Sequence, residues 1–368
     1  MVCIGVVIHG PVVIDSGRAV KLLSLLSGIS RVEAILAGTM GRAAVIDASL
    51  EDIIDISSNH KPSESIRKMI SSCDVVLLVN EGKSIDSGLA FGKLVYGKLG
   101  DINVPLFQIE YGDAGTAGKP QCTIIPWTFA HHPLLDQLID LLQATIMNPQ
   151  PDNRTFFVNG DIIRRRIADV RPGEYVTVNG IVIGKALSFD IEVVSQAGRI
   201  IELKGGELKP HGVEKLKNVD LISAIIRSGP IRPGIFLPRV LDHSSTGRAV
   251  IINHCAEDTF EIAGNADLAV VIGDDTTAIA GDLLSRLGIP MIGIIDGDRD
   301  GLADHTQVPC GSVIIRVSAG NDDVLGLRVQ DKVFHGKGWK DIGGTGFDGI
   351  LSEVMELAGD LVEEVVEY

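Results

Sequence analysis

The clearest chemical signal in the sequence is a group of aspartates that follows an apolar segment. The run Met291 to Ile295 is bounded by a proline and a glycine and precedes aspartates at alternate positions, Asp296, Asp298 and Asp300. Such a run indicates a buried strand of a parallel sheet, and ligands of open α/β sheets bind beyond the carboxyl ends of the strands. Clustered carboxylates repel one another unless a cation lies between them, so this segment predicts a Mg²⁺ site.

A second acidic segment follows the preceding strand, expected at residues 268–272. After Gly273 come Asp274, Asp275, Thr276 and Thr277. Two neighbouring strands that both end in aspartates would point at one crevice, where the threonine hydroxyls and Arg299 could bind phosphate. Two simpler interpretations stay open: a helix N-cap at Asp275 or Thr276, and an Arg299 that only neutralises its neighbours.

The N-terminal part carries secondary candidates, which all follow apolar strands or begin helices. They are His9, Asp15, Ser16, Glu81, Lys83, Asp86 and Ser87. The tetrapeptide Ile-Asp-Ser-Gly occurs at residues 14–17 and again at 85–88, and free N–H groups at such helix starts can bind an anion. Glu81 and Lys83 could serve as base and phosphate ligand. Ordinary caps, a surface ion pair and a structural histidine are the alternatives.

Composition bounds the class of protein. The chain has 368 residues and a net charge of −15, and this acidity disfavours binding of nucleic acid over its whole surface. Aromatic residues make up only 4%, so the cores must be built from Val, Ile, Leu and Ala. No apolar run is long enough to span a membrane, so we expect a cytoplasmic protein with no membrane partner. Association into a homo-oligomer is left open.

The cysteines give no metal signal in the sequence. They are far apart and form no Cys-x-x-Cys pair: Cys3, Cys73, Cys122, Cys255 and Cys310. An odd number of scattered cysteines argues against both a structural zinc site and a disulfide framework. The sequence therefore predicts buried, reduced thiols.

The order of elements predicts the fold class α/β, with two Rossmann-like, doubly wound domains separated by a small antiparallel β domain. We expect an N-terminal domain over 1–150, the β domain over 151–212 and a C-terminal domain over 213–368. In the β domain, Asn179-Gly180 between apolar runs predicts a hairpin. Helices are expected at 213–227 and 347–366.

The C-terminal part resembles the Toprim domain of primases, topoisomerases and small nucleases. The matching residues are the strand at 291–295 and the following Asp296-Gly297-Asp298-Arg299. The resemblance implies that the two aspartates hold Mg²⁺, with Asp300 as a helper. The glutamate that the family carries after its first strand is missing, because Asn253-His254-Cys255 stands there. This departure puts nucleic-acid cleavage or priming in doubt.

Over its full length the chain is also similar to an uncharacterised family of archaeal, largely methanogen, proteins. The similarity rests on the His-Gly-Pro segment at 9–11, the Ile-Asp-Ser-Gly segment at 14–17 and the Asp-Gly-Asp-Arg-Asp-Gly segment at 296–301. It implies an archaeal cytosolic protein and supplies no mechanism.

These observations lead to two hypotheses of different class. The first is a Mg²⁺-dependent protein that handles a phosphorylated small molecule or a nucleotide, with the reaction undetermined. The alternative is a non-catalytic small-ligand sensor or assembly factor, since no complete set of catalytic residues is recognisable in the sequence.

Overall fold

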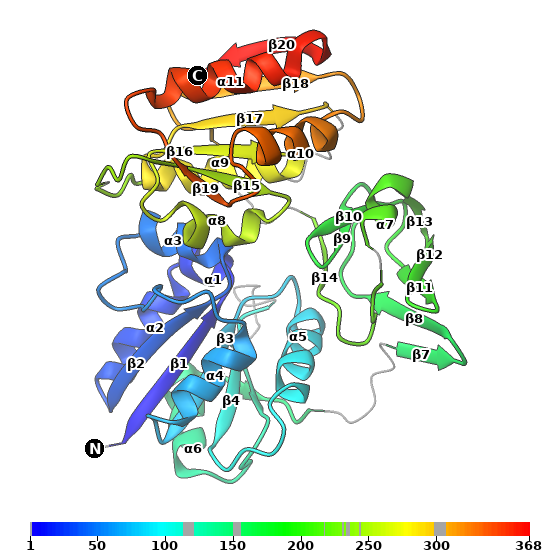
Figure 1. Ribbon diagram of the computed structural model, residues 1–368. Coiled ribbons are helices and arrows are strands. Elements are labelled where there is room, and N and C mark those ends of the chain that lie inside the picture. Colours follow the sequence, from blue (N-terminus) through cyan, green and yellow to red (C-terminus); the bar gives the residue numbers. More distant parts are fainter. Residues whose placement is uncertain are drawn as a thin grey trace. The chain divides into compact units, whose positions relative to one another are not determined.

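The structure is a computed structural model. It describes residues 2–112, 121–149, 156–216, 218–229, 232, 236–242, 244–297 and 307–368. The contacts divide the chain into two compact units, Met1–Arg232 (unit 1) and Pro233–Tyr368 (unit 2). Both units contain a largely parallel sheet flanked by helices, which confirms the α/β class (Figure 1).

The first sheet of unit 1 is doubly wound. Its strands are β1 (Cys3–His9), β2 (Arg31–Ala37), β3 (Val75–Asn80), β4 (Leu106–Glu110), β5 (Thr123–Pro126) and β6 (Thr145–Ile146). They lie in the order β2-β1-β3-β4-β5-β6, and the first four are parallel. The strands β2 and β3 lie on opposite sides of β1, so the order reverses there, and in such sheets the crevice at the reversal is where ligands bind.

Helices cover both faces of this sheet. They are α1 (Val12–Asp15), α2 (Arg18–Ser27), α3 (Met40–Asp47), α4 (Pro62–Ile70), α5 (Ile85–Gly97) and α6 (Pro133–Leu142). One core contains Leu22 of α2 and Leu138 of α6, whereas the core on the other face contains Ile66 of α4 and Val95 of α5. Because both faces are buried, the central strands β1 and β3 are largely continuous apolar runs and do not alternate with polar residues.

The remainder of unit 1 consists of two antiparallel sheets, with strand orders β13-β10-β9-β14 and β12-β11-β8-β7. The strands are β7 (Phe156–Asn159), β8 (Ile162–Ile167), β9 (Tyr175–Val178), β10 (Ile181–Ala186), β11 (Ile191–Gln196), β12 (Arg199–Lys204), β13 (Gly206–Leu208) and β14 (Ile226–Ser228). The hairpin predicted at Asn179-Gly180 is confirmed, because Val178 pairs with Ile181 and both turn residues have positive φ.

The helix predicted at 213–227 is wrong. The helix α7 (Pro210–Lys215) ends early, and β14 pairs with β9. The reason is a contact with a residue distant in sequence. Buried Arg165 of β8 donates hydrogen bonds to the carbonyl oxygens of Leu221 and Ala224, so these carbonyl groups are bonded to the β core and not within a helix. The contact-based unit 1 therefore extends beyond residue 212 to Arg232, while the three-domain division expected from the sequence stays a prediction.

Unit 2 is built on four parallel strands with an antiparallel strand at each edge. The strands are β15 (Arg248–Asn253), β16 (Leu268–Ile272), β17 (Met291–Ile295), β18 (Val313–Val317), β19 (Trp339–Asp341) and β20 (Val362–Glu367). They lie in the order β19-β15-β16-β17-β18-β20. The carboxyl ends of β15 to β18 consequently share one edge of the sheet.

The helices of unit 2 again lie on both faces of the sheet. They are α8 (Thr259–Ala263), α9 (Asp274–Leu287), α10 (Asp322–Lys332) and α11 (Gly346–Ala358), with the 3-10 turns η1 (Ala256–Asp258) and η2 (Gly359–Leu361). Residues of α8 and α9 pack on one face, and residues of α10 and α11 pack on the other. The helix predicted at 347–366 is wrong beyond Ala358, because the valine-rich segment that follows forms β20 against β18.

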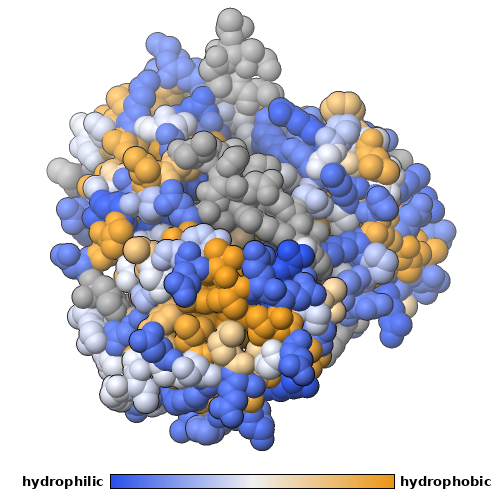
Figure 2. Space-filling view, turned by 90° about the horizontal axis from the view of Figure 1, so that it is seen from above, coloured by the Kyte–Doolittle hydropathy of each residue, from blue (hydrophilic) through white to orange (hydrophobic). Residues whose placement is uncertain are grey.

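The surface view shows hydrophilic and hydrophobic residues side by side (Figure 2). On the face shown in Figure 2, hydrophilic residues are widespread and hydrophobic residues gather in patches between them. Within the part of the chain that the structure describes, no helix has both the length and the apolar character needed to cross a membrane.

Candidate functional site

Three aspartates of unit 2 meet at the carboxyl edge of the sheet. Asp274 begins α9 directly after β16, Asp296 follows β17, and Asp322 begins α10 after β18. One carboxylate oxygen from each residue lies within 4.8 Å of the other two. Three successive parallel strands thus bring one carboxylate each to a single place.

Main-chain donors fix these carboxylates. Asp274 accepts hydrogen bonds from the N–H groups of Asp296, at 2.9 Å, and Gly297, at 3.3 Å. Asp296 in turn accepts one from Gly320, at 2.7 Å. Asp274 and Asp322 are buried and sit in the first turns of α9 and α10, where the helix dipole favours negative charge. The arrangement is therefore set by the backbone.

Three ionised carboxylates this close together repel one another. At 4.8 Å and an effective dielectric constant near 20, two carboxylates repel by about 3 kcal/mol, and the cluster contains three such pairs. The dipole at a helix N-terminus typically stabilises a carboxylate by only about 0.3–1 kcal/mol, which is less than this repulsion. A divalent cation between the oxygens would offset the repulsion, and oxygen ligands of this kind suit Mg²⁺.

Two glycines shape the rim of the cluster. Gly273 has φ +98°, and a Cβ atom there would lie 2.8 Å from Cε1 of His254. Gly297 has φ +86°, and a Cβ atom there would lie 2.7 Å from Nη2 of Arg316. Only glycine adopts these conformations readily and leaves this space. The guanidinium of Arg316 therefore lies against the residue next to Asp296.

The end of β15 contributes a histidine to the same edge. Nε2 of His254 pairs with Oδ1 of Asp323, the second residue of α10. Asn253, the last residue of β15, donates a hydrogen bond to Gln330 at 3.5 Å. At the place where the Toprim resemblance expects a glutamate, the chain thus presents an amide and an imidazole.

The structure brings together only some of the residues predicted from the sequence. Asp274 and Asp296 join the cluster, and Asp275 is not part of the three-carboxylate group. Thr276 and Thr277 are buried in the first turn of α9. Asp298, Arg299 and Asp300 lie outside the described residues.

Asp322 and Arg316 were missed by sequence reasoning. A signal for Asp322 was present: the strand at 313–317 is followed by Asn321-Asp322-Asp323, which repeats the pattern of a strand followed by Asp274-Asp275. No pattern in the sequence pointed to Arg316, because its place follows from the pairing of β17 with β18.

The secondary candidates of unit 1 bind other protein groups. Ser16 donates a hydrogen bond to Glu81 at 2.8 Å, and Arg18 pairs with the other oxygen of Glu81. Burial raises the pKa of Glu81, while the bonds from Ser16 and Arg18 act to lower it. Lys83 pairs instead with Glu174 at 2.8 Å. Glu81 and Lys83 thus have separate partners.

The remaining candidates of unit 1 have structural contacts or lie at a helix start. Asp15 forms an ion pair with Arg232 at 2.6 Å. Ser87 is hydrogen-bonded with Ser84 at the start of α5, where the two side chains form a capping box. Asp86 lies exposed in the first turn of the same helix.

His9 is a half-buried structural residue at the end of β1. Its ring stacks on Phe91 with centroids 4.3 Å apart, and Nδ1 lies 3.2 Å from the carbonyl oxygen of Ala37, to which it can donate. Burial, and secondarily the positive charge of Arg227, lower the pKa of His9 to about 4. The imidazole is therefore neutral at pH 7.

This lowered pKa predicts acid sensitivity. The unfolded chain binds a proton at His9 near pH 6.5, whereas the folded chain does so only near pH 4. The free energy of unfolding should therefore fall as the pH drops from 6.5 to 4, by about 1 kcal/mol per pH unit. Denaturant titrations across this range should show the slope, and His9→Asn should reduce it. An equal slope in the variant would assign the effect to other groups.

Fold and site together define an α/β protein of two units with a three-carboxylate cluster at a sheet edge. The chain belongs to a family described as an uncharacterized protein conserved in archaea, which it matches over residues 6–337. It is 40% identical over 344 residues to the protein MJ0065 of Methanocaldococcus jannaschii, itself described as uncharacterized, and the match covers 89% of this chain and 90% of that protein. No solved structure matches the chain. The archaeal family predicted from the sequence is thus confirmed.

Proposed function

We propose that the protein is a Mg²⁺-dependent phosphate- or nucleotide-handling protein whose unit 2 holds the metal at Asp274, Asp296 and Asp322. The observation that carries this proposal is the meeting of three carboxylates from successive strand ends within 4.8 Å. Mg²⁺ in proteins usually takes one or two carboxylates, keeps several waters and binds substrate phosphate. A phosphate-bearing ligand would complete the coordination of the metal.

Arg316 supports the phosphate part of the proposal. Its guanidinium lies against Gly297, beside the metal site, and its side chain is 47% exposed. The nearest carboxylate oxygen of Glu363 lies 3.7 Å from its Nε. A guanidinium can bind two phosphate oxygens at once, so Arg316 could hold a ligand phosphate against the metal.

His254 is a candidate for moving a proton at this edge. Its Nε2 pairs with Oδ1 of Asp323, and a carboxylate in this position fixes the orientation of the ring. A Toprim-type reaction would instead use a glutamate after the first strand. We therefore propose phosphate chemistry on small molecules, and the Toprim resemblance stays a prediction.

Thermal unfolding tests the proposal. The purified protein would be heated with nucleotides and phosphorylated metabolites, each with and without Mg²⁺. A ligand present at about 100 times its Kd stabilises the folded state by about 2.7 kcal/mol, which corresponds to a shift of about 5 °C or more for a domain of this size. We expect such a shift for at least one ligand together with Mg²⁺, and a smaller one for either alone.

The controls separate the alternatives. Excess EDTA should remove the shift. Release of phosphate or of a cleaved ligand over time would identify an enzyme, whereas binding without turnover would identify the sensor. A melting temperature that no ligand and no millimolar Mg²⁺ changes would contradict both the metal and the phosphate parts of the proposal.

A further inference from the structure

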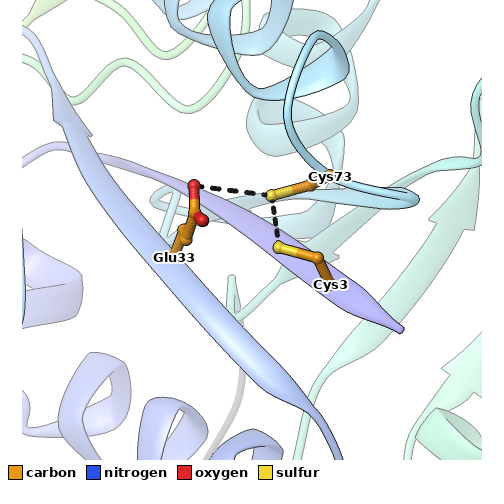
Figure 3. Close-up of side chains that lie close together, drawn as sticks. All are labelled: Cys3, Glu33 and Cys73. Carbon is orange, nitrogen blue, oxygen red and sulfur yellow. Dashed lines mark hydrogen bonds between the residues drawn. The ribbon is translucent and has the colours of Figure 1, made fainter. Parts of the chain in front are cut away.

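A second group of potential metal ligands lies in unit 1, near the amino-terminal ends of the strands of its first sheet. It consists of Cys3 at the start of β1, Glu33 on β2 and Cys73 just before β3 (Figure 3). The two sulfur atoms and a carboxylate oxygen all lie within 4.8 Å of one another. The parallel pairing of β1 with β2 and β3 produces this meeting of residues that are up to 70 positions apart in sequence.

The two thiols are buried and crowded. Cys3 and Cys73 are each only 6% exposed, and their sulfur atoms are 2.8 Å apart. Non-bonded heavy atoms pack best at about 3.5–4 Å, so the sulfurs are closer than their optimum. In tetrahedral coordination, with metal–sulfur bonds of about 2.3 Å, two sulfurs stand about 3.8 Å apart. Insertion of a metal would therefore relieve the crowding.

Neighbouring groups orient the carboxylate. Oε1 of Glu33 pairs with Arg31 at 2.6 Å, while Oε2 faces Cys73 Sγ at 3.8 Å and accepts a hydrogen bond from Ser72 at 3.3 Å. Such partners hold a metal ligand in place and are part of a metal site. A disulfide between the two cysteines would make no use of the carboxylate.

We propose that Cys3, Cys73 and Glu33 bind Zn²⁺, with water as the fourth ligand. Thiolates select soft or borderline cations, so this site is chemically distinct from the all-oxygen cluster of unit 2. Glu33 is half-buried, which leaves a side open for the water. Binding releases one proton from each thiol, so that Zn²⁺, two thiols and one carboxylate give a complex of charge −1 and two protons in solution.

Metal content and a cobalt spectrum test this proposal on the full chain. Protein purified under reducing conditions would be stripped with a chelator and titrated with Zn²⁺ or Co²⁺. We expect one tightly bound ion per chain with a thiolate-to-cobalt charge-transfer band, which carboxylates alone cannot produce. Zn²⁺ should also raise the melting temperature.

Substitutions assign the ligands. Cys3→Ser and Cys73→Ser should each weaken Zn²⁺ binding by about 100-fold or more, and Glu33→Gln by at least about 10-fold, since even neighbours of metal ligands cost 10–100-fold. Cys122→Ser is the matched control, because Cys122 is equally buried but lies outside the group. Glu33→Gln, at a half-buried position, keeps the test valid if a cysteine variant fails to fold.

Three results would overturn the proposal. The first is wild-type protein that takes up no Zn²⁺ at micromolar free metal. The second is a cobalt complex without the charge-transfer band. The third is a mass of the anaerobically purified chain that shows Cys3 and Cys73 joined as a disulfide.

Discussion

Replacing Asp274 by asparagine should abolish Mg²⁺-dependent ligand binding and, at the same time, stabilise the metal-free protein. The amide oxygen of asparagine can still accept the hydrogen bonds from the N–H groups of Asp296 and Gly297. The substitution removes one charge from the cluster and with it two of the three pairwise repulsions. We expect a gain of about 1–3 kcal/mol in EDTA and no further gain when Mg²⁺ and ligand are added.

The matched control is Asp348→Asn. Asp348 also lies in the first turn of a helix of unit 2, α11, but it is exposed and outside the cluster. Loss of its charge should cost about 0.3–1 kcal/mol through the helix dipole and leave the response to Mg²⁺ unchanged. Thermal unfolding of wild type and both variants, each with EDTA and with Mg²⁺ plus ligand, gives the six melting temperatures that this comparison requires.

The sign of the effect in EDTA is the sharpest part of this prediction. A carboxylate that only stabilises the fold loses stability on neutralisation, whereas a carboxylate held near two others for a cation gains it. An Asp274→Asn protein that is less stable than wild type in EDTA, or that still responds to Mg²⁺ as wild type does, would remove the basis for a metal site in unit 2.

Continuous apolar strands were predictable from the sequence because both of their faces are buried. The runs at 75–79, 268–272 and 291–295 form β3, β16 and β17 within a residue of the expected bounds. The segment at 213–227 was not predictable in this way. Its apolar residues pack into the β core, and Arg165, which is distant in sequence, donates hydrogen bonds to two of its carbonyl groups.

The candidate sites also divide into residues that the local sequence could place and residues that only the pairing of distant segments brings together. The meeting of Asp274 and Asp296 could be inferred because each residue lies within two positions of the end of an apolar strand, and neighbouring parallel strands end together. Asp322 is separated from its strand by four residues, so its signal, the pair Asp322-Asp323 after a strand, was weaker than that of Asp274 and was missed. The pair Cys3 and Cys73 has no local signal at all, since only the register of β1 against β3 brings the two residues together.

Replacing Glu110 by glutamine should destabilise unit 1 by about 3 kcal/mol or more. Glu110 ends β4, is fully buried and accepts four hydrogen bonds, from the N–H groups of Gly82 and Gly112 and from the amides of Asn80 and Gln108. Burial raises the pKa of Glu110, while these four donors act to lower it. Four donors around two oxygens fit an ionised carboxylate.

A glutamine in this place must turn its NH₂ group toward two of those donors. It then leaves both without an acceptor, and each buried orphan costs about 1–3 kcal/mol. Urea denaturation measures the loss. Glu81→Gln is the control, because Glu81 lies just past the neighbouring strand, is only half-buried and should tolerate the change with less than about 1 kcal/mol.

The two variants also separate folding from ligand binding. The bonds from Gly82 and Gly112 tie the loops after β3 and β4 to one buried charge, so loosening them disturbs the edge of the sheet that carries Glu81 and Lys83. If that edge serves only the fold, Glu110→Gln should lower stability and leave the Mg²⁺-dependent shift of unit 2 intact. A Glu110→Gln protein as stable as wild type would mean that Glu110 is protonated in the folded chain, since glutamine replaces a neutral carboxylic acid at little cost.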